Sequence, residues 1–71
     1  MKLLVVVIVS LVLDYYTKEP LVGVKISTPQ ETVYTDLNGK FSLNVDSVRV
    51  SYISYVTEMV KNDSVIYLKP Q

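Results

Sequence analysis

The chain has 71 residues, which is enough for one domain, and a domain this small buries only about 60% of the surface that its unfolded form exposes. Seven basic and seven acidic residues cancel, so no basic patch predicts binding to nucleic acid. Because cysteine and histidine are absent, the composition excludes disulfides, thiolate metal sites and the commonest general base of enzymes. Valine, isoleucine, tyrosine and threonine are prominent, which predicts an all-β domain.

The first element, residues 1–13, is an almost continuous apolar run that follows Lys2. It is shorter than the ~20 residues that a membrane-spanning helix needs, so we predict no transmembrane helix. Met1, Lys2 and the apolar run fit a secretory signal peptide, although the usual small-residue cleavage site is missing. The many β-branched residues favour a strand instead, and this is the interpretation we prefer over a signal-like segment.

Six more strands follow in chain order, each marked by alternating polar and apolar residues. In the next one, residues 21–27, we expect Val22, Val24 and Ile26 to share a face, and Gly23 indicates a bulge. The remaining strands are predicted at residues 31–35, 40–45, 48–53, 54–60 and 64–69. Seven short strands at this spacing are typical of a β-sandwich or barrel.

The clearest local signal is the stretch from Thr35 to Phe41, with Asn38-Gly39 at its centre. Both residue types tolerate a positive φ, and Asp36 can hydrogen-bond to the backbone of its own turn. Alternating runs lie on both sides, which predicts a β-hairpin. We therefore assign Asp36, Asn38 and Gly39 a structural role in a turn.

No group of residues predicts catalysis. Asp14, Asp36, Asp46 and Asp63 are single and well separated, so we interpret them as turn formers and not as calcium ligands. A serine nucleophile would lack a histidine base. We therefore predict no enzymatic activity, no metal and no cofactor.

The six tyrosines are the residues best suited to binding a ligand. For most of them we expect an ordinary place in the sheets. Tyr15 and Tyr16 fall in a loop. There, a role in contact with a protein partner or a glycan has as much support as an ordinary structural place.

Several of these motifs occur together in one order. They are Asp14, Thr17-x-Glu-Pro-Leu-x-Gly-Val24, Thr35-Asp-x-Asn-Gly-Lys-Phe41, Ser51-Tyr-Ile-Ser-Tyr55 and Val65-Ile-Tyr-Leu68. In this combination the chain resembles the carboxypeptidase regulatory-like domain family over residues 8–69. The resemblance implies a seven-stranded antiparallel, transthyretin-like β-sandwich of Greek-key type. From the length of the chain, we assign residues 1–71 to one domain. Ser10 and Ser54 stand where that family usually has glycine.

Aligned through Asp14, the resemblance places Ile8, Ser10 and Val12 inward in the first strand. The outward row is entirely apolar and consists of Val7, Val9, Leu11 and Leu13. A soluble monomer rarely exposes such a row, and an edge strand of this kind invites pairing. We therefore predict a protein interface formed by this row with Tyr15 and Tyr16, through strand addition or face packing, to a partner protein or a second copy.

The resemblance also implies an extracytoplasmic setting, in the periplasm, at the outer membrane or on a cell or virion surface of a Bacteroidota-type organism or its virus. We accordingly expect a non-catalytic module that docks on a larger envelope, surface or viral assembly as a structural or protein-binding subunit. Two alternatives are an accessory domain linked to TonB-dependent glycan uptake and a carbohydrate-binding module.

Overall fold

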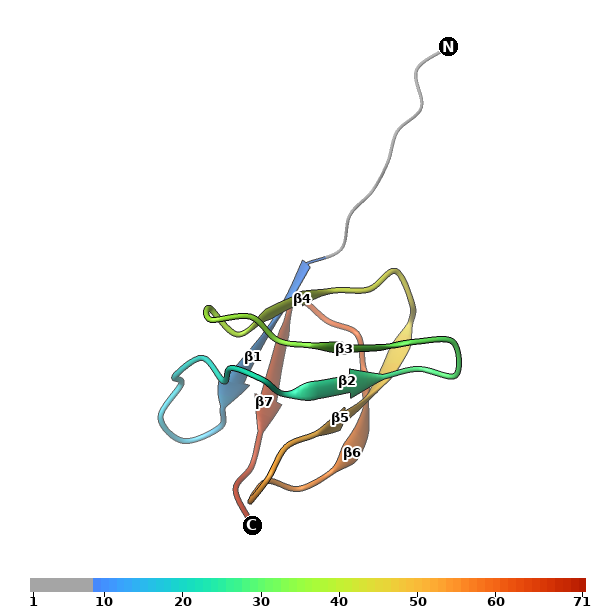
Figure 1. The fold of residues 1–71 in the computed structure, drawn as a ribbon. Coiled ribbons are helices and arrows are strands. Elements are labelled where there is room, and N and C mark those ends of the chain that lie inside the picture. The colour runs from blue at the N-terminus through green and yellow to red at the C-terminus, as the bar shows by residue number, and fades with distance from the viewer. Residues whose placement is uncertain (1–8) are drawn as a thin grey trace.

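The computed structural model describes residues 9–71, and over this range the fold is all-β with no helix. Figure 1 shows the strands, which are β1 (Val9–Asp14), β2 (Lys25–Ser27), β3 (Thr32–Tyr34), β4 (Lys40–Ser42), β5 (Ser47–Ser51), β6 (Glu58–Lys61) and β7 (Val65–Leu68). They match the seven predicted strands in number and order, with shorter bounds. Residues 9–13 form the predicted strand, whereas residues 1–8, including Val7 and Ile8, lie outside the described range.

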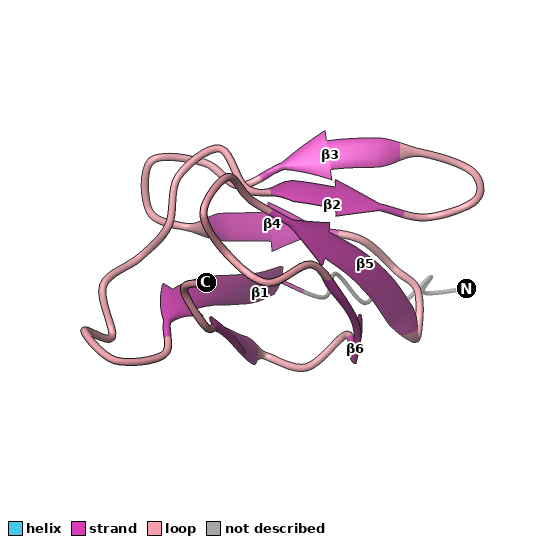
Figure 2. Ribbon diagram, turned by 90° about the horizontal axis from the view of Figure 1, so that it is seen from below, coloured by secondary structure: helices cyan, strands magenta, loops and turns pink. Residues whose placement is uncertain are grey.

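The strands form two sheets, one with the order β4-β1-β7 and one with the order β3-β2-β5-β6. In Figure 2, β3 and β2 lie above β4 and β1. The four-stranded sheet is antiparallel, but β1 pairs with β7 in parallel, so the three-stranded sheet is mixed. The prediction of a wholly antiparallel arrangement is wrong for this pair. Its two strands are not sequential neighbours, since the chain reaches β7 from the other sheet.

The predicted hairpin at Thr35–Phe41 is wrong as a pairing, although the turn itself is present. The N–H of Asp36 donates to the carbonyl of Lys40, and the N–H of Gly39 donates to the carbonyl of Asp36, both at 2.9 Å. However, β3 pairs with β2, and β4 pairs with β1. The turn therefore carries the chain from one sheet to the other, and the short segment between β6 and β7 does the same at the opposite margins.

Only one of the two central turn residues has the predicted backbone. Gly39 has a φ of 74°, whereas Asn38 is not among the described residues with positive φ. The Asn38 N–H instead donates to Oδ1 of Asp36 at 2.8 Å. A Cβ on Gly39 would lie 2.9 Å from both the Pro20 Cβ and the Val12 carbonyl oxygen. Gly39 thus serves both the turn and its close contact with β1.

The core lies between the sheets and contains apolar side chains from most of the strands. Its buried members are Val12, Val24, Ile26, Phe41, Leu43, Val48, Val50, Ile66 and Leu68. Val22 was predicted to share a face with Val24 and Ile26 but is exposed, because the chain turns at Gly23, whose φ is 76°. Thr35 holds this turn: its hydroxyl accepts from the Val24 N–H at 2.9 Å and donates to the Leu21 carbonyl at 2.6 Å.

A polar network inside the first sheet explains Ser10. This residue is buried, and its hydroxyl donates to Oδ1 of Asn62 at 2.7 Å. The Asn62 amide in turn donates to the carbonyls of Leu43 and Val45, both at 2.9 Å. Because the polar side-chain atoms of Ser10 and Asn62 have hydrogen-bond partners, the serine is tolerated in the core. It ties β1 to the segments that follow β4 and β6.

Candidate interaction surface

The outward row of the first strand is partly exposed in the structure. Ser10, Val12 and Asp14 are buried, while Val9 is 52% exposed and Leu11 and Leu13 are half-buried. The predicted alternation is therefore confirmed over residues 9–13, since successive side chains of a strand point to opposite faces. Val7, the remaining member of the predicted row, lies outside the described residues.

The apolar surface extends onto the neighbouring strand β7. Leu11 is paired with Val65, and Leu13 with Tyr67, and both partners in β7 are exposed. We call the surface made by Val9, Leu11, Leu13, Val65 and Tyr67 the outer apolar face. On the other side of β1, the exposed residues Lys40 and Ser42 stand beside Leu11 and Val9 and bound this face with polar groups.

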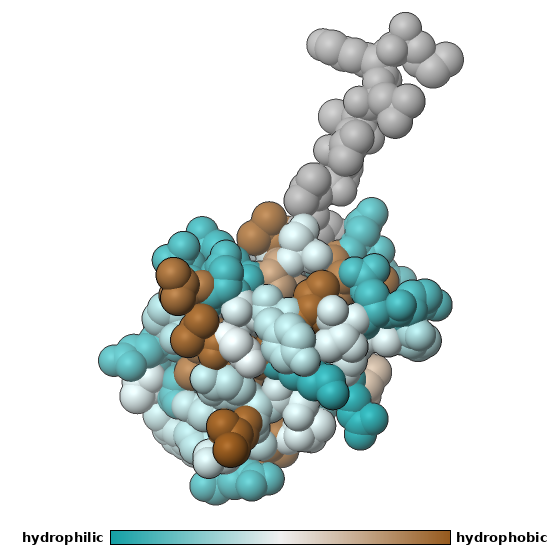
Figure 3. Space-filling view, in the orientation of Figure 1, coloured by the Kyte–Doolittle hydropathy of each residue, from teal (hydrophilic) through white to brown (hydrophobic). Residues whose placement is uncertain are grey.

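The outer face of the four-stranded sheet has a different character. The exposed residues of this outer face are mostly polar: Lys25, Thr32, Tyr34, Ser47, Arg49, Met59 and Lys61. Figure 3 looks onto the side of β2 and β3, where hydrophobic residues form separate patches among hydrophilic and neutral ones. Antiparallel sheets commonly bury one face and present a polar face to water. The three-stranded sheet departs from this pattern.

The strand that carries the row is not an edge strand. Within the described residues, β1 lies between β4 and β7, so the sheet margins are β4 and β7 in one sheet and β3 and β6 in the other. The remaining backbone of β1 is also occupied, because the Val12 N–H donates to the Gly39 carbonyl and the Leu21 N–H to the Val12 carbonyl. Strand addition to β1, one of the two predicted modes, is therefore wrong for residues 9–14. Its pairing partners are distant in the sequence, which is why the position could not be read from β1 alone.

Tyr15 and Tyr16 are exposed at the end of the outer apolar face and belong to a cluster of aromatic and basic side chains. The Tyr15 ring stands edge-on to those of Tyr16 and Tyr67, with centroids 5.2 and 6.3 Å apart. Lys18 Nζ lies 4.6 Å from the centroids of both Tyr15 and Tyr67, and Lys69 Nζ lies 4.7 Å from that of Tyr15. We call these five residues the tyrosine–lysine cluster. Such cation–π contacts hold both ammonium groups beside exposed rings.

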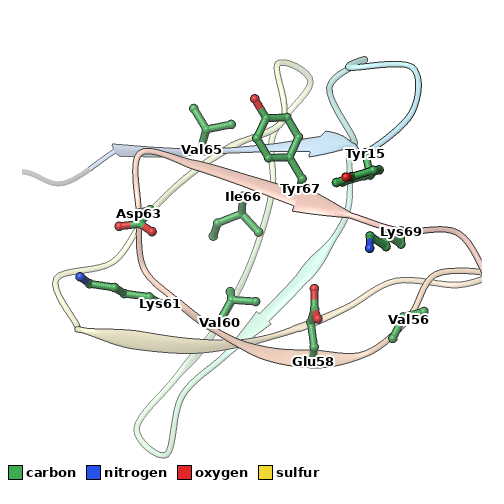
Figure 4. Close-up of a pocket in the computed structure, with 10 residues that line it drawn as sticks. All are labelled: Tyr15, Val56, Glu58, Val60, Lys61, Asp63, Val65, Ile66, Tyr67 and Lys69. Carbon is green, nitrogen blue, oxygen red and sulfur yellow. The ribbon is translucent and has the colours of Figure 1, made fainter.

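A groove of about 350 Å³ runs between β6 and β7, the margins of the two sheets. Figure 4 shows Val60 and Ile66 pointing into it from the two strands. Lys61 and Asp63 lie at one end, and Tyr15 and Lys69 at the other. The groove thus has Val60 and Ile66 at its centre, the carboxylate of Glu58 beside them, and charged groups at both ends.

Asp14 has a larger structural role than the predicted turn former. Its Oδ1 accepts from the N–H groups of Tyr16 at 2.8 Å and Thr17 at 3.0 Å, as a turn residue would. Its Oδ2 accepts from the Tyr55 hydroxyl at 2.6 Å, a contact that the sequence did not predict. The Tyr55 hydrogen bond is the largest cause that holds the pKa of Asp14 below its ordinary value. The same bond raises the pKa of Tyr55.

Asp36 has the expected turn chemistry. Its Oδ1 accepts from the N–H groups of Lys40 and Asn38. These bonds, with the one from Lys40 the larger, lower the pKa of its carboxyl group. Among residues 9–71, no three acidic side chains come together in a group that could hold a metal ion. No helix in this range has the length and apolarity to cross a membrane.

Comparison with known proteins gave no match: no family model fits the chain, and no curated protein or solved structure is significantly similar to it. The candidate surface therefore rests on geometry. Sequence reasoning identified β1, Tyr15 and Tyr16 but missed the contributions of Val65 and Tyr67. Their alternation in the last strand was the signal that could have identified them, once β7 was known to lie beside β1.

Proposed function

We propose that the protein is a non-catalytic interaction module that docks onto another protein through the outer apolar face, as a subunit of a larger envelope, surface or viral assembly. The observation that carries this proposal is the contiguous row of apolar side chains on adjacent strands, with Leu11 beside Val65 and Leu13 beside Tyr67. Contiguous exposed apolar patches often mark interaction sites, whereas single exposed apolar residues are common on any protein surface. The outer face of the four-stranded sheet is mostly polar, so the apolar character is particular to the outer face of the three-stranded sheet.

The finer fold assignment is part of the proposal. The seven strands in sheets of three and four support a transthyretin-like β-sandwich, the architecture that the family resemblance implies. The backbone at Ser54 adds support, because its φ of 67° is one that glycine adopts readily, and the resembled family usually has glycine there. The extracytoplasmic setting rests on that resemblance.

The chemistry of the surface narrows the docking mode and the partner. Both margins of β1 are occupied, so the partner packs on the face of the sheet and does not extend it at β1. Lys18 and Lys69 lie at the end of the face, and Lys40 lies along its side. The partner that fits best has a flat apolar patch with acidic residues at its border.

Site-specific photocrosslinking in the producing cells tests this assignment. A photoreactive phenylalanine analogue replaces Tyr67 on the outer apolar face or, as a matched control, Tyr34 on the outer face of the other sheet. We expect one defined protein adduct from position 67 and none from position 34. The purified partner should then bind Leu11→Glu at least tenfold more weakly than the unchanged chain. Equal adducts at both positions, or unchanged binding by Leu11→Glu, would contradict the proposal.

Glycan binding is the second candidate, favoured by the exposed rings of the tyrosine–lysine cluster. Tyr16 has the most exposed of its three rings, at 69%. Rings stack on sugars, and the ammonium groups of Lys18 and Lys69 would favour an acidic glycan. Calorimetric titration with uronic-acid oligosaccharides tests this candidate, with Tyr16→Ala as the variant expected to lose binding. Absence of binding by the unchanged chain would rule out an acidic-glycan site at the cluster. A TonB-dependent receptor as the crosslinked partner would favour the accessory-domain alternative.

A further inference from the structure

Strand β7 has a margin whose backbone groups face away from its sheet. Among the described residues it pairs with β1 alone. The Leu11 N–H donates to the Ser64 carbonyl at 2.9 Å, and the Tyr15 N–H donates to the Leu68 carbonyl at 2.8 Å. Because backbone groups of successive residues alternate in direction along a strand, even-numbered residues face β1. The N–H and C=O groups of Val65 and Tyr67 therefore face outward.

The space beside this margin is open. The groove between β6 and β7 is lined by Val65, Ile66 and Tyr67, so it follows the outward backbone of β7 along most of its length (Figure 4). Beyond Tyr67 the margin closes, because the Lys69 carbonyl accepts from the Val56 N–H at 3.0 Å. The free backbone is thus limited to a short length centred on Ile66.

We propose that a second copy of this chain pairs with that margin, strand β7 against strand β7, antiparallel and about a two-fold axis at Ile66. In this register Val65 of one copy stands opposite Tyr67 of the other, and the two exchange both backbone hydrogen bonds. The two-fold axis repeats the exchange. The pairing uses the N–H and C=O groups that face outward and needs no group already bonded to β1. Isologous contacts of this kind are the usual basis of dimers.

The side chains agree with the same register. Val65 meets the ring of Tyr67 of the second copy, which is a favourable cross-strand pair. Asp63 comes near the side chain of Lys69 of the second copy, just beyond the backbone exchange, since the Lys69 carbonyl stays bonded to Val56. Asp63 and Lys69 lie at the two ends of the β7 margin (Figure 4). Opposite charges directly across an antiparallel pair stabilise it, and like charges oppose it.

The alternative two-fold axis, at Tyr67, is less consistent with the observations. It would place Val65 opposite Lys69 of the second copy, although the Lys69 carbonyl is already bonded to Val56. It would also leave Asp63 without a lysine opposite. An axis between Ile66 and Tyr67 would set outward side chains against inward ones, which an antiparallel pair does not allow. The axis at Ile66 keeps Val65 opposite Tyr67 on both sides of the two-fold and brings Asp63 near Lys69; at Lys69 it needs contact between side chains only, because the Lys69 carbonyl stays bonded to Val56.

Pairing at Ile66 joins two three-stranded sheets into one continuous sheet and brings the two outer apolar faces together side by side. We therefore predict that the chain associates with itself through β7 and not through β1. The inference stands on the backbone and charges of β7 and does not depend on the proposed docking of another protein. A short strand pair buries little surface, so we expect weak, concentration-dependent association.

Charge reversal gives a sharp test with the full chain. Sedimentation equilibrium over a wide concentration range should show a mass that rises from 8.0 kDa, the mass of one chain, toward twice that value. Asp63→Lys and Lys69→Glu should each weaken association at least tenfold, because each places like charges opposite one another. An equimolar mixture of these two variants should associate again, since both cross-strand pairs are then of opposite charge. Glu31→Lys, an exposed charge reversal in the loop before β3, serves as the control and should change nothing.

Amide hydrogen exchange identifies the strand directly. The amides of Val65 and Tyr67 should become protected as the concentration rises, whereas those of Ile66 and Leu68, which face β1, should be protected throughout. A mass of one chain at every concentration, or single variants that associate as well as the unchanged chain, would overturn the inference. Failure of the mixture to associate would overturn the register. Association abolished by Leu11→Glu but unaffected at positions 63 and 69 would place self-association on the outer apolar face instead.

Discussion

The Tyr55 hydroxyl donates a hydrogen bond of 2.6 Å to Oδ2 of Asp14, although 41 positions separate the two residues in the sequence. Asp14 ends β1 in the three-stranded sheet, and Tyr55 lies between β5 and β6 of the four-stranded sheet. The bond therefore links the two sheets at the end of the molecule that carries Tyr15 and Tyr16. It orders the turn in which the tyrosine–lysine cluster begins.

Tyr55→Phe should lower the stability of the fold, because it removes the hydroxyl and leaves one oxygen of the buried Asp14 carboxylate without its partner. Urea unfolding followed by circular dichroism measures the change as a lower midpoint. Tyr34→Phe is the matched control, since Tyr34 is exposed and its hydroxyl makes no hydrogen bond within the described residues. Equal midpoints for the two variants would show that the Asp14–Tyr55 bond contributes nothing to stability.

Stability should fall in acid. Hydrogen bonds hold the pKa of Asp14 and of Asp36 below the ordinary value of 3.8. The stabilisation from each carboxylate is therefore fully present above its unfolded pKa and is lost as the pH falls through its lower folded pKa. Urea midpoints at a series of pH values should decline below about pH 4, and Asp14→Asn should flatten that decline. An unchanged decline in Asp14→Asn would contradict this account.

Tyr55 has the opposite dependence on pH. Its pKa is raised above the ordinary value of 10.0 by the bond to Asp14. The stabilisation is therefore fully present below pH 10.0 and is lost as the pH rises through the higher folded pKa. Tyr55→Phe should remove this alkaline loss while leaving other alkaline effects unchanged.

Two glycines with nearly the same backbone angles allow two contributions to stability to be measured separately. One is the cost of a left-handed backbone, and the other is the cost of crowding around an added Cβ. Gly39 and Gly23 have φ values of 74° and 76°, but only Gly39 has atoms within 4 Å of an added Cβ. Gly23→Ala should cost about 1–2 kcal/mol through the left-handed backbone alone. Gly39→Ala should cost about 3 kcal/mol or more, because Pro20 and β1 must also move. Similar losses for the two variants would show that the Gly39 contact is easily relieved.

Ser54→Gly should stabilise the protein by about 0.5–1 kcal/mol, because the serine holds a left-handed backbone that costs an L-residue about 1–2 kcal/mol. Its φ is 67°. Ser64→Gly is the control, since Ser64 is exposed and has no positive φ, and it should cost about 0.5–1 kcal/mol. A thermal scan of both variants checks the pair. A loss in both would mean that the turn at Ser54 carries no strain.

The strands were predictable because each one alternates apolar and polar residues, as in Val48–Ser51 and Val65–Leu68. Their partners were not. The turn at Asp36–Lys40 shows where the chain reverses, but nothing local determines whether the next strand joins the same sheet. The central position of β1 depends on pairing with Phe41 and Ile66, which are remote in the sequence.

The candidate surface shows the same limit. Leu11 and Leu13 were identified because they break the expected alternation within one strand. Tyr67 and Lys69 join them only through the parallel pairing of β1 with β7. Likewise, the sequence showed only that Ser10 stands where the resembled family usually has glycine. That its hydroxyl donates to Asn62 is visible only in the fold.

The central claim is that a bound partner protein covers the outer apolar face in the producing cells. Because the chain has no cysteine, Tyr67→Cys and Tyr34→Cys each provide a single thiol whose rate of maleimide labelling reports its accessibility. In the purified chain at low concentration both positions should react quickly. In the producing cells, position 67 should react at least tenfold more slowly and position 34 at an unchanged rate. Equal rates at position 67 in both settings would contradict the account.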